Sequence, residues 1–255
     1  MSSASSAVDS ADPTRTGDDP AHAGRPQAAD GRNARTAATR AAITAAAERL
    51  FAERGVSAVS NRQVGESAGQ ANNTAVAYHF GSKADLIRAI IRNHAQDIEA
   101  RRAPRLESTR GSADIRDWIQ CLVLPSTEHF SALGTPSWYA RFNAQVMTDP
   151  ALRTLIYEDA LASASLQETL QGLRATAGAI PPRIRRTRAD MARQLLVHMC
   201  SERERDLALA AAGTADPGLQ HWAGASVDGD VGTWEELSAD LVDALTGLWT
   251  APVTR

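Results

Sequence analysis

Residues 60–86 read SNRQVGESAGQANNTAVAYHFGSKADL and contain two short helix patterns separated by a tight turn. Ser60 is an N-cap type of residue before the first pattern, Asn72 is one before the second, and Gly81 follows the second. A helix-turn-helix of this kind places its second helix in the major groove of DNA, which at about 12 Å is wide enough to admit a helix. The stretch therefore predicts a helical reader of duplex DNA.

Several side chains of this stretch are of the types that contact DNA. Asn can make two hydrogen bonds to adenine, and the Thr methyl group can meet the thymine methyl group. Arg62 is suited both to reading guanine and to holding a phosphate, and Lys83 lies in the first turn of the next helix, where phosphates bind. The predicted DNA-contacting residues are Arg62, Gln63, Asn72, Asn73, Thr74, Tyr78, His79 and Lys83.

Some of these residues have a structural alternative. Asn72 could cap its helix without reading a base, and His79 could be a structural histidine at a helix end. Outside the motif, Arg25, Arg32 and Arg35 could form an arm in the minor groove, or belong to a tail with no such role.

The charge distribution supports a polyanionic partner for the same part of the chain. Residues 32–105 carry 12 basic and 6 acidic side chains, whereas residues 1–31 sum to −3 and residues 106–255 to −6. A positive field confined to one segment is typical of nucleic-acid binding. Residues 1–34, rich in Ser, Ala, Asp, Gly and Pro, hold too little apolar surface to fold and are predicted to be disordered.

The rest of the sequence also has helical periodicity, and the predicted fold class is all-α. Ile43, Ala47, Leu50 and Phe51 form one helix face, and a long helix after Ser82 is predicted to end at Pro104. Further helices are predicted over residues 112–132, 136–147, 150–177, 182–212 and 233–250, with a surface loop over 213–232. The expected division is a disordered extension over 1–34, a helix-turn-helix domain over 35–82 and a regulatory and dimerisation domain over 83–255.

Composition and motifs exclude several other classes. No apolar run reaches the roughly 18 residues of a membrane span, and the N-terminus has no apolar signal region. The two cysteines, Cys121 and Cys200, form no metal motif and are read as small buried hydrophobes in a reducing cytoplasm. Since no GxSxG, P-loop or HExxH pattern occurs, we expect no catalytic site, no metal and no cofactor.

Three segments carry a family resemblance: AERLFAERG at residues 47–55, VGESAG at 64–69 and YHFGSKADL at 78–86. With these, residues 38–92 resemble the DNA-binding domain of the TetR family of transcriptional regulators. The resemblance implies a homodimeric, all-helical protein with an N-terminal DNA reader and a larger ligand-sensing domain. It also implies that Arg62, Asn73, Tyr78, His79 and Lys83 face DNA. The sequence departs from the family pattern at Gly65, at Ala77, where an aromatic residue is common, and in a turn that is one residue longer.

The C-terminal part offers candidates for a ligand pocket and for a dimer interface. Ligand pockets in helical domains are apolar and aromatic with few polar groups, and the predicted lining residues are Trp118, His129, Phe130, Trp138, Tyr139 and Phe142, with ordinary core packing as the alternative. Apolar stripes on the last two long helices suit a helix–helix seam. By the resemblance, the dimer interface is assigned to Met191, Leu195, Met199, Trp234, Leu237, Leu241, Leu245 and Leu248.

These observations favour a ligand-responsive transcriptional regulator. We expect a cytoplasmic repressor that binds a palindromic DNA operator as a homodimer and responds to an unknown small-molecule effector, without a membrane partner. A second hypothesis is a helical sensor or protein-interaction module that has the fold but does not bind specific DNA, which Ala77 and the acidic remainder favour. A third is a small-molecule enzyme built on the aromatic cluster.

Overall fold

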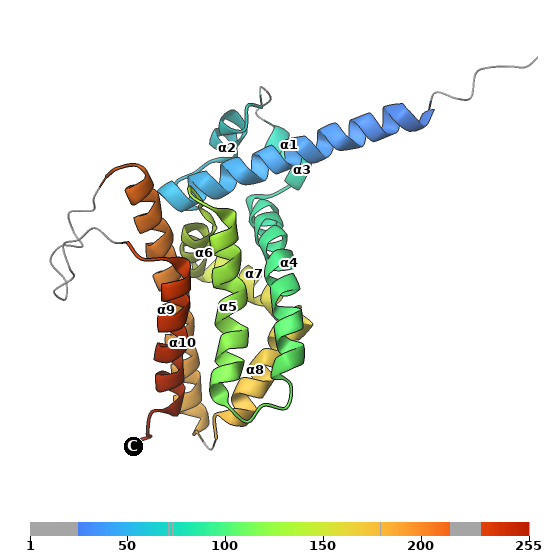
Figure 1. The fold of residues 1–255 in the computed structure, drawn as a ribbon. Coiled ribbons are helices and arrows are strands. Elements are labelled where there is room, and N and C mark those ends of the chain that lie inside the picture. Colours follow the sequence, from blue (N-terminus) through green and yellow to red (C-terminus); the bar gives the residue numbers. More distant parts are fainter. Residues whose placement is uncertain (1–24, 71, 73, 179, 215–230, 255) are drawn as a thin grey trace, which may run out of the picture. The chain divides into compact units, whose positions relative to one another are not determined.

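Helices form all the regular secondary structure in the residues that the computed structural model describes, which are 25–70, 72, 74–178, 180–214 and 231–254. This confirms the predicted all-α class (Figure 1). None of the helices within those ranges is long and apolar enough to cross a membrane. The helices are α1 (Arg25–Arg54), α2 (Asn61–Ser67), α3 (Ala75–Phe80), α4 (Lys83–Thr109), α5 (Ile115–Leu133), α6 (Tyr139–Thr148), α7 (Pro150–Leu161), α8 (Ala164–Thr176), α9 (Pro182–Ala211) and α10 (Trp234–Thr250).

The chain divides into two compact units, residues 1–39 and residues 40–255. In the first unit, α1 begins at Arg25, ten residues before the predicted start, so the disorder predicted for residues 25–34 is wrong. Extending an existing helix needs no new nucleation, and the Ala, Arg and Gln residues here are good helix formers. The remainder of that prediction, residues 1–24, lies outside the described residues, and the predicted domain boundaries stay predictions.

The predicted end of α4 at Pro104 is also wrong, because the helix continues to Thr109. Proline removes one backbone hydrogen bond from a helix, but packing can offset that loss. The turns on either side of Pro104 are held by buried side chains, since Arg102, Leu106 and Thr109 are each almost fully covered.

The single helix predicted over residues 150–177 is two helices, α7 and α8. Ser163 separates them, because its backbone is extended and its hydroxyl accepts a hydrogen bond from the Leu166 N–H at 3.2 Å. The same hydroxyl donates to the Glu99 carboxylate of α4 at 2.6 Å. An N-cap with a partner on another helix thus sets the break, and hydrophobic periodicity does not record it. The predicted loop 213–232 lies largely outside the described residues.

In the second unit, α5 packs against α4, α8 and α10, while α9 packs against α6 and α10 (Figure 1). The predicted apolar face of α1 is buried, with Ile43, Ala47, Leu50 and Phe51 in the core. The apolar stripe of α10 is buried too, and it is covered by this same chain.

Glu204 of α9 is a buried anion that holds α6 in place. One carboxylate oxygen accepts hydrogen bonds from the Ser137 hydroxyl at 2.9 Å and the Ala140 N–H at 3.2 Å. The other accepts from the backbone N–H and the guanidinium Nε of Arg141, at 2.9 and 3.1 Å. Orphan N–H groups at the start of a helix favour a negative charge, so Glu204 caps α6 from another element.

Trp118 and Gly172 form the closest packing between α5 and α8. The indole Nε1 of Trp118 donates to the Ser112 carbonyl at 3.1 Å, which fixes the ring. A Cβ atom at Gly172 would lie 2.3 Å from Cε3 of that ring, so only glycine fits beneath it.

We expect Gly172→Ala to lower the free energy of unfolding by roughly 1–3 kcal/mol, because the fixed indole ring cannot move away from the added methyl group. Gly65→Ala, also within a helix, is expected to raise it by about 0.5–1 kcal/mol. There the added Cβ would lie 3.9 Å from Cγ2 of Val76, an ordinary contact. Urea unfolding measures both, and two variants of equal stability would contradict this packing.

Candidate nucleic-acid interface and effector groove

The start of α2 is fixed by a capping box. The Ser60 hydroxyl accepts the Gln63 N–H at 3.3 Å, and the Gln63 side-chain carbonyl accepts the Ser60 N–H at 2.8 Å. This arrangement satisfies backbone N–H groups that the first helical turn leaves without partners. The side chain of Gln63, predicted to contact DNA, therefore holds the helix end with its oxygen.

The turn between α2 and α3 is organised by Asn72. Its side-chain oxygen accepts hydrogen bonds from the backbone N–H and the hydroxyl of Thr74, at 2.9 and 2.7 Å. The predicted capping role of Asn72 is wrong, because the N-cap of α3 is Thr74, whose side chain makes no capping hydrogen bond; Asn72 instead holds the turn before the helix. The predicted base-reading residue Asn73 lies outside the described residues.

The α3 helix has an inner and an outer face. Ala75 and Val76 are buried, whereas Thr74 and Ala77 are exposed and the side chain of Tyr78 is 83% exposed. Burying large phenol rings is favourable, so a tyrosine left this open is suited to an interaction with a partner. The ring of His79 contacts the ring of Tyr78 edge-on, with centroids 5.0 Å apart.

Arg62 lies on the exposed side of α2. Its Nε atom is 3.4 Å from the Glu66 carboxylate, and both side chains are more than half exposed. An exposed ion pair of this kind is weak and leaves the guanidinium able to exchange its partner for a phosphate or a base. The predicted DNA contact of Arg62 is compatible with this placement and stays a prediction.

Lys83 is placed differently from what the sequence predicts. Its ammonium group donates to the carbonyl oxygens of Val56 and Val59, the latter at 2.5 Å, and lies 5.5 Å from the centre of the Phe51 ring. Partial burial lowers the pKa of this amine. In this structure Lys83 ties α4 to the loop between α1 and α2, rather than presenting its charge to a phosphate.

Arg40 of α1 is a residue of the reader that the sequence reasoning missed. Its guanidinium donates to the His79 carbonyl and lies 4.2 Å from the centre of the Phe80 ring. These contacts hold the C-terminal end of α3, where the last carbonyls lack helical partners. Arg40 lies one turn before Ile43 on the same helix, and this spacing is the sequence feature that could have indicated a place beside the core.

Four of the six predicted pocket residues lie together in the core. His129, Phe130, Tyr139 and Phe142 form neighbouring ring contacts with centroids 6.0–6.1 Å apart. Phe142 also stacks on Phe51 of the reader, at 6.2 Å. Trp118 of α5 is buried against Gly172 of α8, and Trp138 is partly buried. None of the six lines the groove described next, and their role in a ligand pocket stays a prediction.

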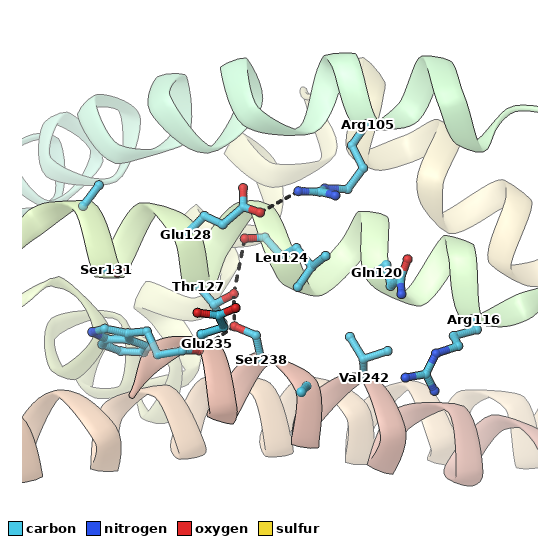
Figure 2. A pocket seen from close by; sticks show the side chains of 13 residues that line it. Arg105, Arg116, Gln120, Leu124, Thr127, Glu128, Ser131, Glu235, Ser238 and Val242 are labelled. Carbon is cyan, nitrogen blue, oxygen red and sulfur yellow. Dashed lines mark hydrogen bonds and ion pairs between the residues drawn. The ribbon is translucent and has the colours of Figure 1, made fainter. Parts of the chain in front are cut away.

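A groove of about 640 Å³ lies between α4, α5 and α10, and the sequence did not point to it. Figure 2 shows Arg105 reaching from α4 to Glu128 of α5, at 2.5 Å, and Ser238 of α10 meeting Thr127 of α5, at 2.7 Å. At the other end of the groove, the guanidinium of Arg116 forms an ion pair with the carboxylate of Asp243. The apolar part of the lining comes from Leu124, Ala132, Trp234, Ala239 and Val242.

The predicted dimer residues separate into two groups. Trp234, Leu237, Leu241 and Leu245 are buried within one chain, so the prediction that they form the dimer surface is wrong. The physical reason is that α10 turns its apolar stripe toward α5. Met191 and Met199 of α9 are 52% and 41% exposed, Leu195 and Leu248 are partly buried, and their interface role stays a prediction.

Comparisons with known proteins bear on the same elements. Residues 43–90 match the family model described as bacterial regulatory proteins, tetR family. A comparison with curated protein sequences gives no match. Among solved structures, a TetR-family regulator from Streptomyces coelicolor is 21% identical, with 84% of this chain and 96% of that chain covered and a TM-score of 0.31. The family match spans the end of α1, all of α2 and α3, and the first turns of α4.

We expect Lys83→Met to lower the free energy of unfolding by roughly 1–3 kcal/mol, because it keeps the aliphatic stem but leaves two carbonyls without their donor. Arg62→Met removes the same charge from an exposed ion pair and is expected to change stability by less than about 0.5 kcal/mol. Thermal and urea unfolding check both. A Lys83→Met protein as stable as the parent would contradict the structural role.

Proposed function

We propose that this chain, whose residues 43–90 are those of the tetR family of bacterial regulatory proteins, is a cytoplasmic, ligand-responsive transcriptional repressor that binds a palindromic operator as a homodimer. The observation that carries the proposal is the two-faced α3 helix. Its inner face is buried at Val76 while its outer face leaves Thr74 and Tyr78 open. A short helix held in this way is what major-groove reading needs.

Dimerisation supplies the geometry that one short helix cannot. A two-fold dimer would present two α3 helices about 34 Å apart, one turn of DNA, and so select a palindrome. In this proposal the interface runs along the exposed side of α9, through Met191, Leu195 and Met199. Two exposed thioethers about two helical turns apart, with Leu195 between them, suit a helix–helix seam.

The proposed effector site is the groove between α4, α5 and α10. Its volume of about 640 Å³ lies in the range of small-molecule sites, and its lining combines five apolar side chains with eight polar or charged ones. An effector changes DNA binding only to the extent that it binds the two conformations of the dimer with different affinity. We therefore propose that occupation of the groove favours a dimer whose α3 spacing does not fit the operator.

We expect Arg62→Ala to weaken binding to the specific operator by roughly 1–3 kcal/mol and binding to random duplex by less. The measurement is fluorescence anisotropy at stated salt, with a duplex from upstream of the protein's own gene and a scrambled duplex. Arg174→Ala is the matched control, because it removes an exposed arginine from α8. Equal losses on both duplexes would contradict base reading, and a parent protein that binds neither would favour the interaction-module alternative.

We expect Met191→Glu combined with Met199→Glu to convert the dimer to a monomer, because two charges per chain would have to be buried in the seam. Sedimentation velocity measures the change. Operator affinity should fall with it, since each half-site would be bound alone. A double variant that stays dimeric would place the interface on another surface.

A further inference from the structure

Three side chains from three helices form a continuous line of hydrogen bonds in the second unit. The carboxylate of Glu48, on α1, lies 2.9 Å from Nε2 of His94, on α4. Nδ1 of the same imidazole lies 2.8 Å from Nε2 of His129, on α5. Glu48 belongs to the segment matched by the family model, whereas His129 lies 39 residues beyond the end of that segment.

The line is buried and its rings are held. The side chain of His129 is 2% exposed and that of His94 is 13% exposed. The His94 ring stacks on Tyr139 of α6 at a centroid distance of 3.6 Å. Among the described residues no group could hold a metal ion, and the two imidazoles contact each other directly. Such a direct contact fixes the spacing of α4 and α5.

The protonation of the three side chains decides which atom donates in each of the two hydrogen bonds. Ionised Glu48 can only accept, so Nε2 of His94 carries its proton. The bond between the two rings forms in either protonation state of His94: Nδ1 of a neutral His94 accepts the Nε2–H of His129, and the Nδ1–H of a protonated His94 donates to Nε2 of His129. Burial and the neighbouring His94 lower the pKa of His129 to about 4, which keeps this ring neutral at physiological pH. The remaining charged or titratable neighbours are Asp97 and Arg101 of α4 and Tyr139 of α6.

The α5 turn that carries His129 also carries part of the groove wall. Thr127, Glu128 and Ser131 line the groove, and His129 leaves the same turn toward α4. Trp234 makes a second link between the groove and the histidines. It lines the groove, and the centre of its ring lies 5.3 Å from that of Phe130, the residue next to His129. A molecule that displaces this turn of α5 must therefore move His129 or break its bond to His94.

We propose that the Glu48–His94–His129 line is the connection through which the arrangement of α5, at the groove, is passed to α1 of the DNA reader. This inference rests on the proposed function and identifies how that function is regulated. His94 and His129 are positioning residues, which act on DNA affinity through Glu48 and α1. By linkage, binding of DNA at the reader must in turn stabilise α5, because coupling between two sites is reciprocal.

The experiment measures hydrogen exchange of α5 in the full chain, with and without the upstream duplex. The breaking variant is His129→Leu, which removes the ring nitrogen bonded to His94, and the conservative variant is His129→Gln, whose side-chain amide can still donate to or accept from His94. Gln171→Leu, at an exposed position of α8, is the matched control. We expect the duplex to slow exchange in α5 roughly fivefold or more in the parent protein, in His129→Gln and in the control. In His129→Leu the duplex should still bind, but it should not slow hydrogen exchange in α5. An equal slowing in His129→Leu would overturn the proposal.

A second measurement needs no DNA. Glu48 and His129 do not bond to each other, but both bond to His94. The double variant Glu48→Leu with His129→Leu is therefore expected to shift the urea midpoint by less than the sum of the shifts of the two single variants. Additive shifts would overturn the line as a connection. If the parent protein binds no duplex while the shifts are non-additive, the proposed function fails and the connection between α1 and α5 stands.

Discussion

The position of α3 depends on the burial of Val76 against α2. The helix has only six residues, and a helix of that length is not stable in water by itself. It persists here because its inner face, Ala75 and Val76, is buried against neighbouring helices, and because both of its ends are held. Asn72 organises the turn before it, and Arg40 donates to the carbonyl of His79 at its end. These contacts leave the outer face of the helix free to meet a partner.

The helix-turn-helix and the all-α class could be predicted because they are encoded locally. Caps, glycines and apolar spacing at residues 60–81 all act within a few residues of one another, and the structure keeps them. The roles of Lys83 and Arg40 could not be predicted in the same way. Each depends on which backbone groups lie nearby after folding, and the carbonyls that Lys83 binds are 24 and 27 residues away in sequence.

The helices that follow α4 show the same limit at a larger scale. The stripe on α10 was correctly read as apolar, but periodicity does not say whether a face is covered by the same chain or by a second copy. The aromatic residues near Tyr139 were correctly grouped, yet they fill space rather than enclose it. The groove was missed because its walls come from three helices and most of its lining side chains are polar or charged. The buried histidine pair likewise joins residues 35 positions apart, on a contact that no short motif records.

The central claim is that the outer face of α3 meets duplex DNA. Oxidative labelling of tyrosines, followed by mass spectrometry, tests it directly, because Tyr78 on α3 is 83% exposed and Tyr157 on α7 is 38% exposed in the same chain. With saturating duplex from upstream of the gene, labelling of Tyr78 should fall strongly while labelling of Tyr157 stays the same. Unchanged labelling of Tyr78 in a protein that has bound the duplex would contradict the account.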